Sequence, residues 1–473
     1  MKQSLWIGGE YRPSATYSEL KNPYNLEHIA DIAVAGRDDV LDAISAAEQA
    51  AEKLAAMPAH VRAEILEKVA GFLKEEREEC AKLISQEAAK PLKAARAEVD
   101  RTIMTYTFAS HEARRIHGET VPMDAAPGGE GRIAFTVREP LGVIAAITPF
   151  NFPMNLVAHK VGPAIAAGNP VVLKPASQTP LSAYKIAQLF HRAGLPHGAL
   201  NVVTGSGRSV GDILMKDERI KMITFTGSPE VGRYIRENSG LKRVTLELGS
   251  NSAVIVDEGV NLEKVIPRIV TGAFSYQGQV CISIQRIFVH EKVFEAFTQR
   301  IVEEVKKLNI GNPLEEDTDI SALISRGDVQ RTKAWVDEAV ANGAGLKIGG
   351  SFTDGIYQPT VLVDVPLGEK VSCEEIFAPV VHINRFTTLD EAIAMVNDSK
   401  YGLQAGIFTN DIHHGLQAAK RLEVGGVMIN EIPTFRVDNM PYGGLKLSGM
   451  GREGIKYAVE EMTELKLISF KME

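Results

Sequence analysis

The sequence predicts an α/β fold built on parallel sheets. From residue 143 onward, short apolar runs alternate with helical stretches, which is the pattern of a parallel sheet covered by helices. A second series of the same kind follows Glu263. The chain has 473 residues, of which 45% are hydrophobic and 24% charged. It can therefore bury a large core, and its length corresponds to about three domains.

The first third of the chain is predicted to be helical after a short hairpin around Gly8–Gly9. Asp38 is expected to cap the first helix. From 61 to 84, apolar residues recur at the spacing of one helix face. This spacing places Cys80 in the core and leaves the charged run 74–79 on the solvated face. A further helix is expected from about 94 to 117.

The strands are predicted by alternation or by short apolar runs. Alternating residues at 132–139, preceded by three glycines, indicate a strand after a hairpin. The first parallel series is expected at 143–147, 171–173, 200–203, 222–225 and 253–256. The second series is expected at 287–289, 360–362, 380–384, 405–408 and 426–430. A late strand with charged flanks is expected at 465–470.

Composition excludes several classes of protein. The net charge of −8 disfavours a nucleic-acid-binding surface. No run reaches the ~18 apolar residues of a membrane helix, and the N-terminus lacks a signal core, so we expect a cytoplasmic protein. The three cysteines, Cys80, Cys281 and Cys373, are too few for a disulfide framework, and no cluster has metal-ligand spacing. No metal is expected.

Three residues could carry covalent chemistry. Cys281 follows Gly278 closely, where backbone N–H groups could support a thiolate, although a buried small hydrophobe is the simpler interpretation. Glu247 lies between two leucines at a strand end, where burial would raise its pKa toward that of a general base; the alternative is a solvent-facing strand residue. Asn151, between two phenylalanines, could donate to an oxyanion or serve only as a turn residue.

Two segments could bind a nucleotide. The glycine-rich stretch 224–232 follows a strand and opens a helix, so its N–H groups could face a phosphate. It is neither a Walker loop nor a G-x-G-x-x-G motif, and its glycines alone are a weak signal. Lys174 ends the strand at 171–173, and the carboxyl ends of parallel strands are where nucleotides bind.

These weak signals belong to a set of motifs that runs along nearly the whole chain in a fixed order. Together they resemble the aldehyde dehydrogenase superfamily. The matching pieces are Thr148-Pro-Phe-Asn-Phe-Pro, Gly162-Pro-Ala-Ile-Ala-Ala-Gly-Asn, Lys174-Pro-Ala-Ser, Phe225-Thr-Gly-Ser, Leu246-Glu-Leu-Gly, Gly278-Gln-Val-Cys, Glu374-Glu-Ile-Phe-Ala-Pro-Val, and Pro441-Tyr-Gly-Gly with Ser448-Gly.

The resemblance implies two Rossmann-like parallel-sheet domains and a small β oligomerisation element. The cofactor-binding domain would comprise 1–121 and 141–248, with a return at 447–462, and the catalytic domain 249–446. The oligomerisation element would comprise 122–140 and 463–473. Because exposed edge strands invite pairing with another chain, a homodimer or homotetramer is expected.

The resemblance also implies NAD(P)-dependent oxidation of an aldehyde to its carboxylic acid. Cys281 would form a thiohemiacetal whose oxyanion is held by Asn151 and the Cys281 N–H, and hydride loss would leave a thioester. Glu247 would activate the water that hydrolyses it. Lys160 and Glu453 match positions that relay protons in the family.

The same resemblance assigns cofactor contacts and leaves two departures. Ser177 stands where strictly NAD-using members often carry a glutamate that repels a 2′-phosphate. NADP is therefore expected to be accepted alongside NAD, and a preference for NADP is left open. Ser250 replaces a commoner glycine, and we have no account of it. The expected contacts are Lys174 and Ser177 at the adenosine ribose, Gly227 and Ser228 at the pyrophosphate, and Glu375, Phe377 and Phe150 at the nicotinamide end.

The substrate is less constrained. Arg101 and His159 resemble basic residues that bind anionic aldehydes, and Arg436 could add a third positive group. Val280 stands where some such enzymes have an arginine. An ion pair for Arg101 and core packing for His159 are equally consistent with the sequence. We expect a short aldehyde with a hydroxyl or acidic group, such as lactaldehyde, succinate semialdehyde or a phosphorylated or sulfonated aldehyde.

Two alternatives remain open. An enzyme that transfers the acyl group to coenzyme A would lack the water-activating glutamate, and Glu247 disfavours it. A non-catalytic structural protein of the same fold would have lost the nucleophile or the base, whereas Cys281, Glu247 and Asn151 are all present.

Overall fold

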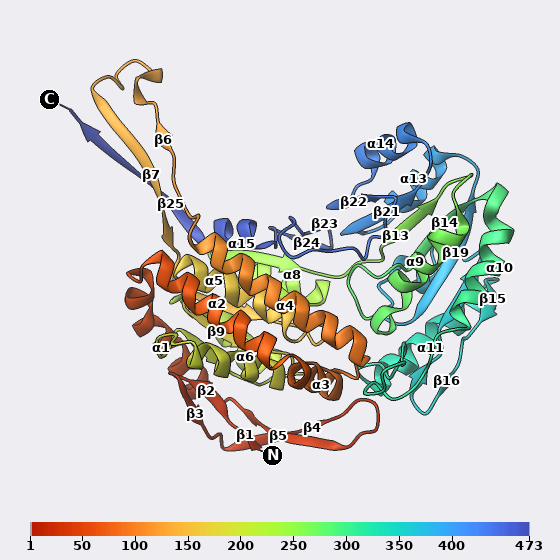
Figure 1. Cartoon of the computed structure of the whole chain (residues 1–473), viewed down its shortest axis with the longest axis horizontal. Coiled ribbons are helices and arrows are strands. Elements are labelled where there is room, and N and C mark those ends of the chain that lie inside the picture. Colours follow the sequence, from red (N-terminus) through yellow and green to blue (C-terminus); the bar gives the residue numbers. More distant parts are fainter. Residues whose placement is uncertain (1, 473) are drawn as a thin grey trace.

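Two sheets, each with parallel central strands, organise the chain, and a narrow β arm projects from the first of them (Figure 1). The structure is a computed structural model that describes residues 2–472. Each strand expected from the apolar runs is present, so the predicted parallel α/β fold is confirmed. The strand at 253–256 was expected in the first series, but it belongs to the second sheet because it pairs with the strands at 286–290 and 404–408. Within the described residues, no helix has both the length and the apolar character required to cross a membrane.

The first sheet has eight strands, of which the five central ones are parallel and the edge strands antiparallel. Its central strands are buried because helices cover both faces. In spatial order the strands are β24 (Gly449–Met450), β12 (Arg243–Glu247), β11 (Ile220–Thr226), β8 (Val143–Ile147), β9 (Val171–Lys174), β10 (Leu200–Val202), β2 (Leu5–Ile7) and β3 (Glu10–Arg12).

Helices pack on both faces of this sheet, and one of them is completely buried. All thirteen residues of α5 (Asn155–Ala167) are buried, and Gly162 lets it approach α4, since a Cβ there would lie 3.3 Å from that of Ala109. Polar side chains on α5 must therefore find partners inside the protein. The other helices are α1 (Arg37–Ala55), α2 (Ala59–Glu75), α3 (Arg77–Ala88), α4 (Leu92–Ala113), α6 (Leu181–Arg192), α7 (Asp212–Lys216), α8 (Pro229–Asn238) and α15 (Ile455–Glu461).

The second sheet has seven strands, of which only the edge strand β15 is antiparallel to its neighbour. The strand order is β15 (Gly345–Ile348), β18 (Thr360–Val363), β19 (Val380–Phe386), β14 (Arg286–His290), β13 (Ala253–Val256), β21 (Gln404–Phe408) and β22 (Gly426–Ile429). Its helices are α9 (Leu262–Phe274), α10 (Phe294–Val305), α11 (Arg326–Ala341), α12 (Lys370–Cys373), α13 (Leu389–Asn397) and α14 (Ile412–Arg421). Two short antiparallel pairs complete this part: the hairpin of β16 (Phe352–Thr353) with β17 (Ile356–Tyr357), and the pair of the distant strands β20 (Tyr401–Gly402) and β23 (Leu445–Lys446).

The projecting arm is a three-stranded antiparallel sheet. Strand β7 (Arg132–Pro140) pairs along its whole length with β25 (Thr463–Lys471), and at its other edge with β6 (Thr120–Val121). Both faces of the arm expose large apolar side chains to solvent. Those that are about half exposed are Ile133, Leu465, Leu467 and Phe470.

The N-terminal region departs from expectation in three places. The predicted 61–84 helix is two helices, because the backbone leaves helical geometry at Glu76, whose carboxylate binds Lys185 and Arg192. The first helix begins after Gly36, and Asp39 rather than Asp38 accepts the N–H of Gly36 at 2.8 Å. The three-stranded sheet of β1 (Lys2–Gln3), β5 (His28–Val34) and β4 (Thr16–Lys21) was not predicted. The hairpin at Gly8–Gly9 is confirmed.

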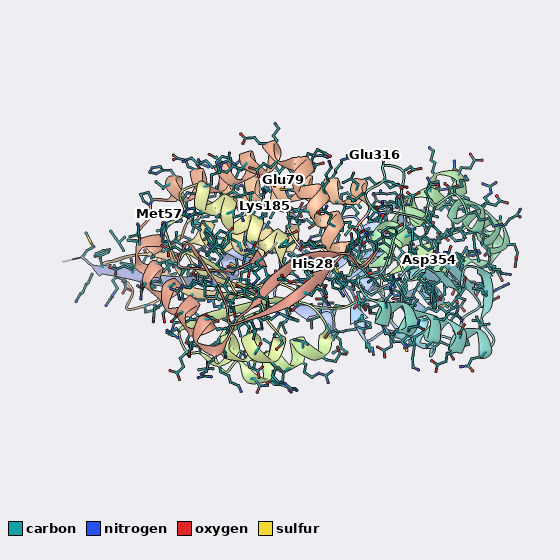
Figure 2. All side chains as sticks on the ribbon, turned by 90° about the horizontal axis from the view of Figure 1, so that it is seen from below. His28, Met57, Glu79, Lys185, Glu316 and Asp354 are labelled. Carbon is teal, nitrogen blue, oxygen red and sulfur yellow. The ribbon has the colours of Figure 1, made fainter. Side chains whose placement is uncertain are left out.

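Surface ion pairs join the two halves of the molecule. Glu316, which Figure 2 shows where the second half meets the helices of the first, binds the guanidinium of Arg96 on α4. Arg96 also binds Glu78 of α3 at 2.9 Å. Within the first half, Lys185 on α6 pairs with Glu79 on α3 at 2.7 Å, and the two labels lie together in the same view (Figure 2). Such exposed pairs contribute little individually but fix the relative placement of elements.

Candidate active site

Two adjoining cavities lie at the carboxyl ends of the parallel strands β8 and β11. One has a volume of about 600 Å³ and contains Cys281 in its wall, and the other has a volume of about 680 Å³ and contains Lys174 in its wall. The segments Pro149–Phe150 and Thr226–Ser228 line both cavities, so they form the boundary between them. This is the position at which open α/β sheets bind ligands.

The loop that carries Cys281 is held in an unusual conformation. After α9 the backbone turns through left-handed conformations at Tyr276 (φ 50) and Gln277 (φ 55), which cost free energy in residues other than glycine. Gln277 anchors the turn by donating hydrogen bonds to the carbonyls of Ala89 and Ala322. A Cβ at Gly278 would lie 2.3 Å from the Ala378 oxygen, so only glycine fits there. The loop is therefore fixed before any ligand binds.

The Cys281 sulfur is half-buried at the cavity wall. It lies 2.7 Å from the hydroxyl of Tyr442. Burial raises the pKa of the thiol to about 11, while the Tyr442 hydroxyl and the Arg436 charge act in the opposite direction. Burial therefore favours the neutral thiol, and these two neighbours lower the free-energy cost of forming the thiolate.

Asn151 lies against the same loop. Its side-chain Nδ2 donates to the carbonyl of Gln279 at 2.9 Å, and its Oδ1 is buried with no partner among residues 2–472. Its backbone carbonyl accepts a hydrogen bond of 2.6 Å from Lys90, which forms a fully buried ion pair with Glu98. The structure thus brings the carboxamide of Asn151 next to the Cys281 loop and holds it from behind.

Glu247 ends strand β12 and is 3% exposed. Both of its carboxyl oxygens lack a hydrogen-bond partner in the described chain. Burial, and then the negative charge of Glu453, raise its pKa well above the usual range. Glu247 does not line the cavity itself, but rotation toward the cavity would break no hydrogen bond.

A buried ion-pair network lies behind this part of the cavity. Lys160 on α5 binds Glu453 at 2.9 Å and contacts the Thr224 hydroxyl at 3.2 Å. The other carboxylate oxygen of Glu453 accepts a bond of 3.0 Å from Arg436. Lys160 and Glu453 match the proton-relay positions of the family. In the structure they form a network of ion pairs with Arg436, which lines the cavity.

Two of the three predicted substrate contacts bind Asp438, and the third contacts one of these two. Asp438 binds Arg101 at 2.6 Å and His159 at 2.8 Å, and Arg436 contacts His159 at 3.4 Å. Arg101 and Arg436 line the cavity, whereas His159 is buried behind them and does not line it. Burial lowers the pKa of His159, which favours the neutral imidazole. His159 therefore supports the two arginines rather than presenting a charge to the cavity.

The second cavity suits an anionic, hydroxyl-rich ligand. The Lys174 ammonium is buried and donates only a long bond of 3.4 Å, to the Pro175 carbonyl, within the described chain. Burial lowers its pKa to about 8, as expected for a cation that lacks a counter-ion. Ser228 caps α8 by accepting the N–H of Val231, so the helix N-terminus faces a site that could bind phosphate. Ser177 is exposed on the same wall.

Near the boundary between the cavities, Glu375 packs closely against the backbone of Gly249 and Ser250. A Cβ at Gly249 would lie 2.5 Å from Glu375, whose carboxylate accepts the Ser250 N–H at 2.9 Å. Burial raises the pKa of Glu375 to about 7. Phe377 has a left-handed backbone (φ 51), and its ring packs edge-on against Phe150. Glu375, Phe377 and Phe150 are thus together, as the cofactor assignment requires.

The sequence reasoning missed four residues that the structure places in the site. Tyr442 belongs to the Pro-Tyr-Gly-Gly motif, but nothing in the motif indicates that its hydroxyl contacts Cys281. Asp438 stands two positions after Arg436 but pairs with the distant Arg101, so its position along the chain provided no signal for its partner. Lys90 and Glu98 stand eight positions apart, and nothing in their spacing distinguishes them from exposed charges. Their burial and their ion pair are evident only in the fold.

Known proteins share this fold and sequence. The aldehyde dehydrogenase family model matches residues 11–468. The 3-sulfolactaldehyde dehydrogenase of Priestia aryabhattai is 47% identical over 464 residues, which cover 98% of this chain and 97% of that protein.

Two solved structures match closely. Aldehyde dehydrogenase 21 from Physcomitrella patens, in complex with the reaction product succinate, has a TM-score of 0.97 at 42% identity and covers 99% of this chain and 98% of its own. Glyceraldehyde-3-phosphate dehydrogenase GapN from Methanocaldococcus jannaschii, complexed with NADP, has a TM-score of 0.92 at 41% identity. The match covers 96% of this chain and 98% of that protein. The chain therefore belongs to the aldehyde dehydrogenase family and is an NAD(P)-dependent aldehyde dehydrogenase.

Proposed function

We propose that this enzyme oxidises a short aldehyde bearing an acidic or hydroxyl group, with Cys281 as nucleophile. The observation that carries the proposal is a single cavity lined by Cys281, Asn151, Arg101 and Arg436. A thiol, an amide donor and two guanidinium groups thus surround one space of about 600 Å³. That volume is suited to a small substrate together with the reacting end of a cofactor.

The residues divide the reaction into two steps. The Cys281 sulfur bonds to the aldehyde carbon, and the oxyanion so formed accepts hydrogen bonds from Asn151 Nδ2 and the Cys281 backbone N–H. When NAD or NADP is bound, it supplies the acceptor for the hydride that leaves this carbon. Glu247 then takes a proton from water, the water oxygen bonds to the thioester carbon, and the carbon–sulfur bond breaks to release the acid. Glu247 also favours hydrolysis over transfer to coenzyme A.

The second cavity is proposed as the cofactor site. The Lys174 ammonium, which pairs with no carboxylate among residues 2–472, and the α8 N-terminus at Gly227 and Ser228 would hold the ribose and the phosphates. Glu375 would bind the nicotinamide ribose, between Phe150 and Phe377. The two separate sheets and the arm support the division of the chain into a cofactor domain (1–121, 141–248 and 447–462), a catalytic domain (249–446) and an oligomerisation element (122–140 with 463–473).

Ser177 is expected to permit NADP. In the variant Ser177→Glu, a carboxylate on the wall of the second cavity would repel a 2′-phosphate, so kcat/KM for NADP should fall about 100-fold, or ~2.7 kcal/mol. The value for NAD should change much less. The matched control Gln178→Glu adds the same charge one residue along the same wall and should alter the ratio far less. An unchanged NADP-to-NAD ratio in Ser177→Glu, or an NAD preference above ~100-fold in the wild type, would contradict the assignment.

The substrate class rests on the two cavity arginines. Arg101 lines the cavity while it pairs with Asp438, and the Nε of Arg436 is buried with no acceptor among residues 2–472. A buried donor without an acceptor is costly, and a carboxylate, sulfonate, phosphate or hydroxyl oxygen of the substrate would satisfy it. The relatives named above for sulfolactaldehyde and for glyceraldehyde 3-phosphate have substrates of this chemical type.

Arg101→Ala is expected to reduce selectivity for charged aldehydes. With two four-carbon substrates, succinate semialdehyde and butyraldehyde, the ratio of their kcat/KM values should fall at least about tenfold, or ~1.4 kcal/mol. Because a structural defect would affect both substrates, the ratio isolates the charge. The control Arg114→Ala removes an exposed ion pair near the end of the same helix and should leave the ratio unchanged. Equal losses for both aldehydes in Arg101→Ala would refute a substrate contact.

The arm is proposed to join copies of the chain into a dimer or a tetramer. Its two faces expose Ile133, Leu467 and Phe470, each more than half exposed, and its strand β25 has a free edge in the described chain. Leu467→Glu should therefore reduce the mass measured by light scattering, whereas Leu241→Glu, at an exposed residue elsewhere, should not. A monomeric wild-type protein would rule the proposal out.

Three free cysteines, one of them the proposed nucleophile, are consistent with a reducing compartment such as the cytoplasm.

A further inference from the structure

The hydroxyl of Tyr442 is a feature of the site that the mechanism above does not use. It lies 2.7 Å from the Cys281 sulfur, and the residue is only 3% exposed. A phenylalanine would fill the same space and line the same cavity, so the hydroxyl itself requires a reason. In the described chain its hydrogen-bond partner is the reacting sulfur.

The direction of this hydrogen bond depends on the charge of the sulfur. When Cys281 is a thiol, either atom can donate. When it is a thiolate, only the tyrosine can donate, and a hydrogen bond to an anion is about twice as strong as one between neutral groups. Burial raises the pKa of Tyr442 well above its usual range, so the phenol keeps its proton. The contact therefore stabilises the thiolate more than the thiol.

Arg436 strengthens this donor. Its guanidinium carbon lies 3.6 Å from the centre of the Tyr442 ring, and its own position is fixed by the buried Glu453. A cation over the ring draws electron density from the phenol and makes its hydroxyl a better donor. The other charged groups that act on Cys281 are Glu247 and Glu375, and both oppose ionisation of the thiol.

We propose that Tyr442 is a further catalytic residue of this enzyme, which stabilises the Cys281 thiolate through its hydroxyl while Arg436 polarises the phenol from the face of the ring. The proposal rests on the role of Cys281 as nucleophile. In the free enzyme the thiol proton passes to solvent, and Tyr442 retains its own proton throughout. Once the sulfur bonds to the aldehyde carbon, the anionic acceptor is gone and the hydrogen bond weakens, so the stabilisation does not trap the acyl-enzyme.

The test is the pH dependence of alkylation of Cys281 by iodoacetamide, in which the thiolate displaces iodide. Peptide mass spectrometry of the full-length enzyme separates Cys281 from the half-buried Cys373 and the buried Cys80. In Tyr442→Phe the alkylation midpoint should rise by about one pH unit, so that about tenfold less thiolate is present at neutral pH. The midpoint is the readout, since a more basic thiolate is also intrinsically more nucleophilic.

Two further variants keep the test decisive. Tyr184→Phe removes another buried hydroxyl, which contacts Thr204 at 2.9 Å, and should leave the midpoint unchanged. Replacing Tyr442 with 3-fluorotyrosine keeps the ring, makes the phenol a stronger donor and should lower the midpoint. New alkylation of Cys80 would reveal unfolding, in which case the fluorotyrosine result decides. Midpoints equal to wild type in folded Tyr442→Phe, or in the fluorotyrosine enzyme, would overturn the proposal. Alkylation needs no aldehyde turnover, so this failure is distinct from failure of the proposed function.

Discussion

Cys281→Ser is expected to abolish aldehyde oxidation, with kcat/KM falling by at least ~10,000-fold. A serine hydroxyl is nearly the same size as the thiol, but its pKa lies far above that of a cysteine, and the buried site offers no base in contact with it. The hydrogen bond to Tyr442 can persist with oxygen in place of sulfur, so the fold and the cavity should be preserved. The loss would therefore report on the nucleophile alone.

The control for this substitution is Cys373→Ser. Cys373 is half-buried at the end of α12 and lies outside both cavities, so its substitution should leave kcat/KM within about twofold of wild type. Binding of NADP, measured by calorimetry, should be unaffected in both variants. Substantial turnover by Cys281→Ser, above about a tenth of the wild-type rate, would show that another group forms the bond to the substrate.

Glu247→Gln is expected to separate the two halves of the reaction. The amide fills the same volume but cannot take a proton from water, so steady-state turnover should fall about 1,000-fold. Formation of the thioester does not need this carboxylate, so a burst of reduced cofactor, about one per active site, should persist. The control Glu237→Gln, at an exposed position on α8, should change neither phase. A burst lost together with turnover would assign Glu247 to the first step instead.

The same residue should control the pH dependence of hydrolysis. Burial and the nearby Glu453 raise the pKa of Glu247, and a general base acts only when deprotonated. The rate of acyl-enzyme hydrolysis should therefore increase with pH up to the folded-state pKa and level off above it. In Glu247→Gln this dependence should disappear, leaving only the slow attack by hydroxide.

Much of the fold follows from local sequence. The four residues of β13 are all apolar and all buried, and such a run between turn signals could form a strand only inside a covered sheet. Glu247 was expected at a strand end in a desolvated place, and it ends β12 with a raised pKa. In these cases the burial of each residue is determined largely by its immediate neighbours.

Other features depend on contacts between distant residues. Glu76, at the break between α2 and α3, forms ion pairs with Lys185 and Arg192, more than a hundred positions later in the chain. The hydroxyl of Tyr442 reaches Cys281 across 161 positions. No periodicity or spacing records such pairs, because each partner occupies an ordinary local pattern and only the tertiary fold brings the two together.

The most direct test of the mechanism is peptide mass spectrometry of the Glu247→Gln enzyme, quenched with acid after one burst with succinate semialdehyde and NADP. The account predicts an acyl adduct on the peptide that contains Cys281, in an amount equal to the reduced cofactor, and none on the peptides of Cys80 or Cys373. Reduced cofactor formed without an adduct on Cys281, or with an adduct on another residue, would contradict it.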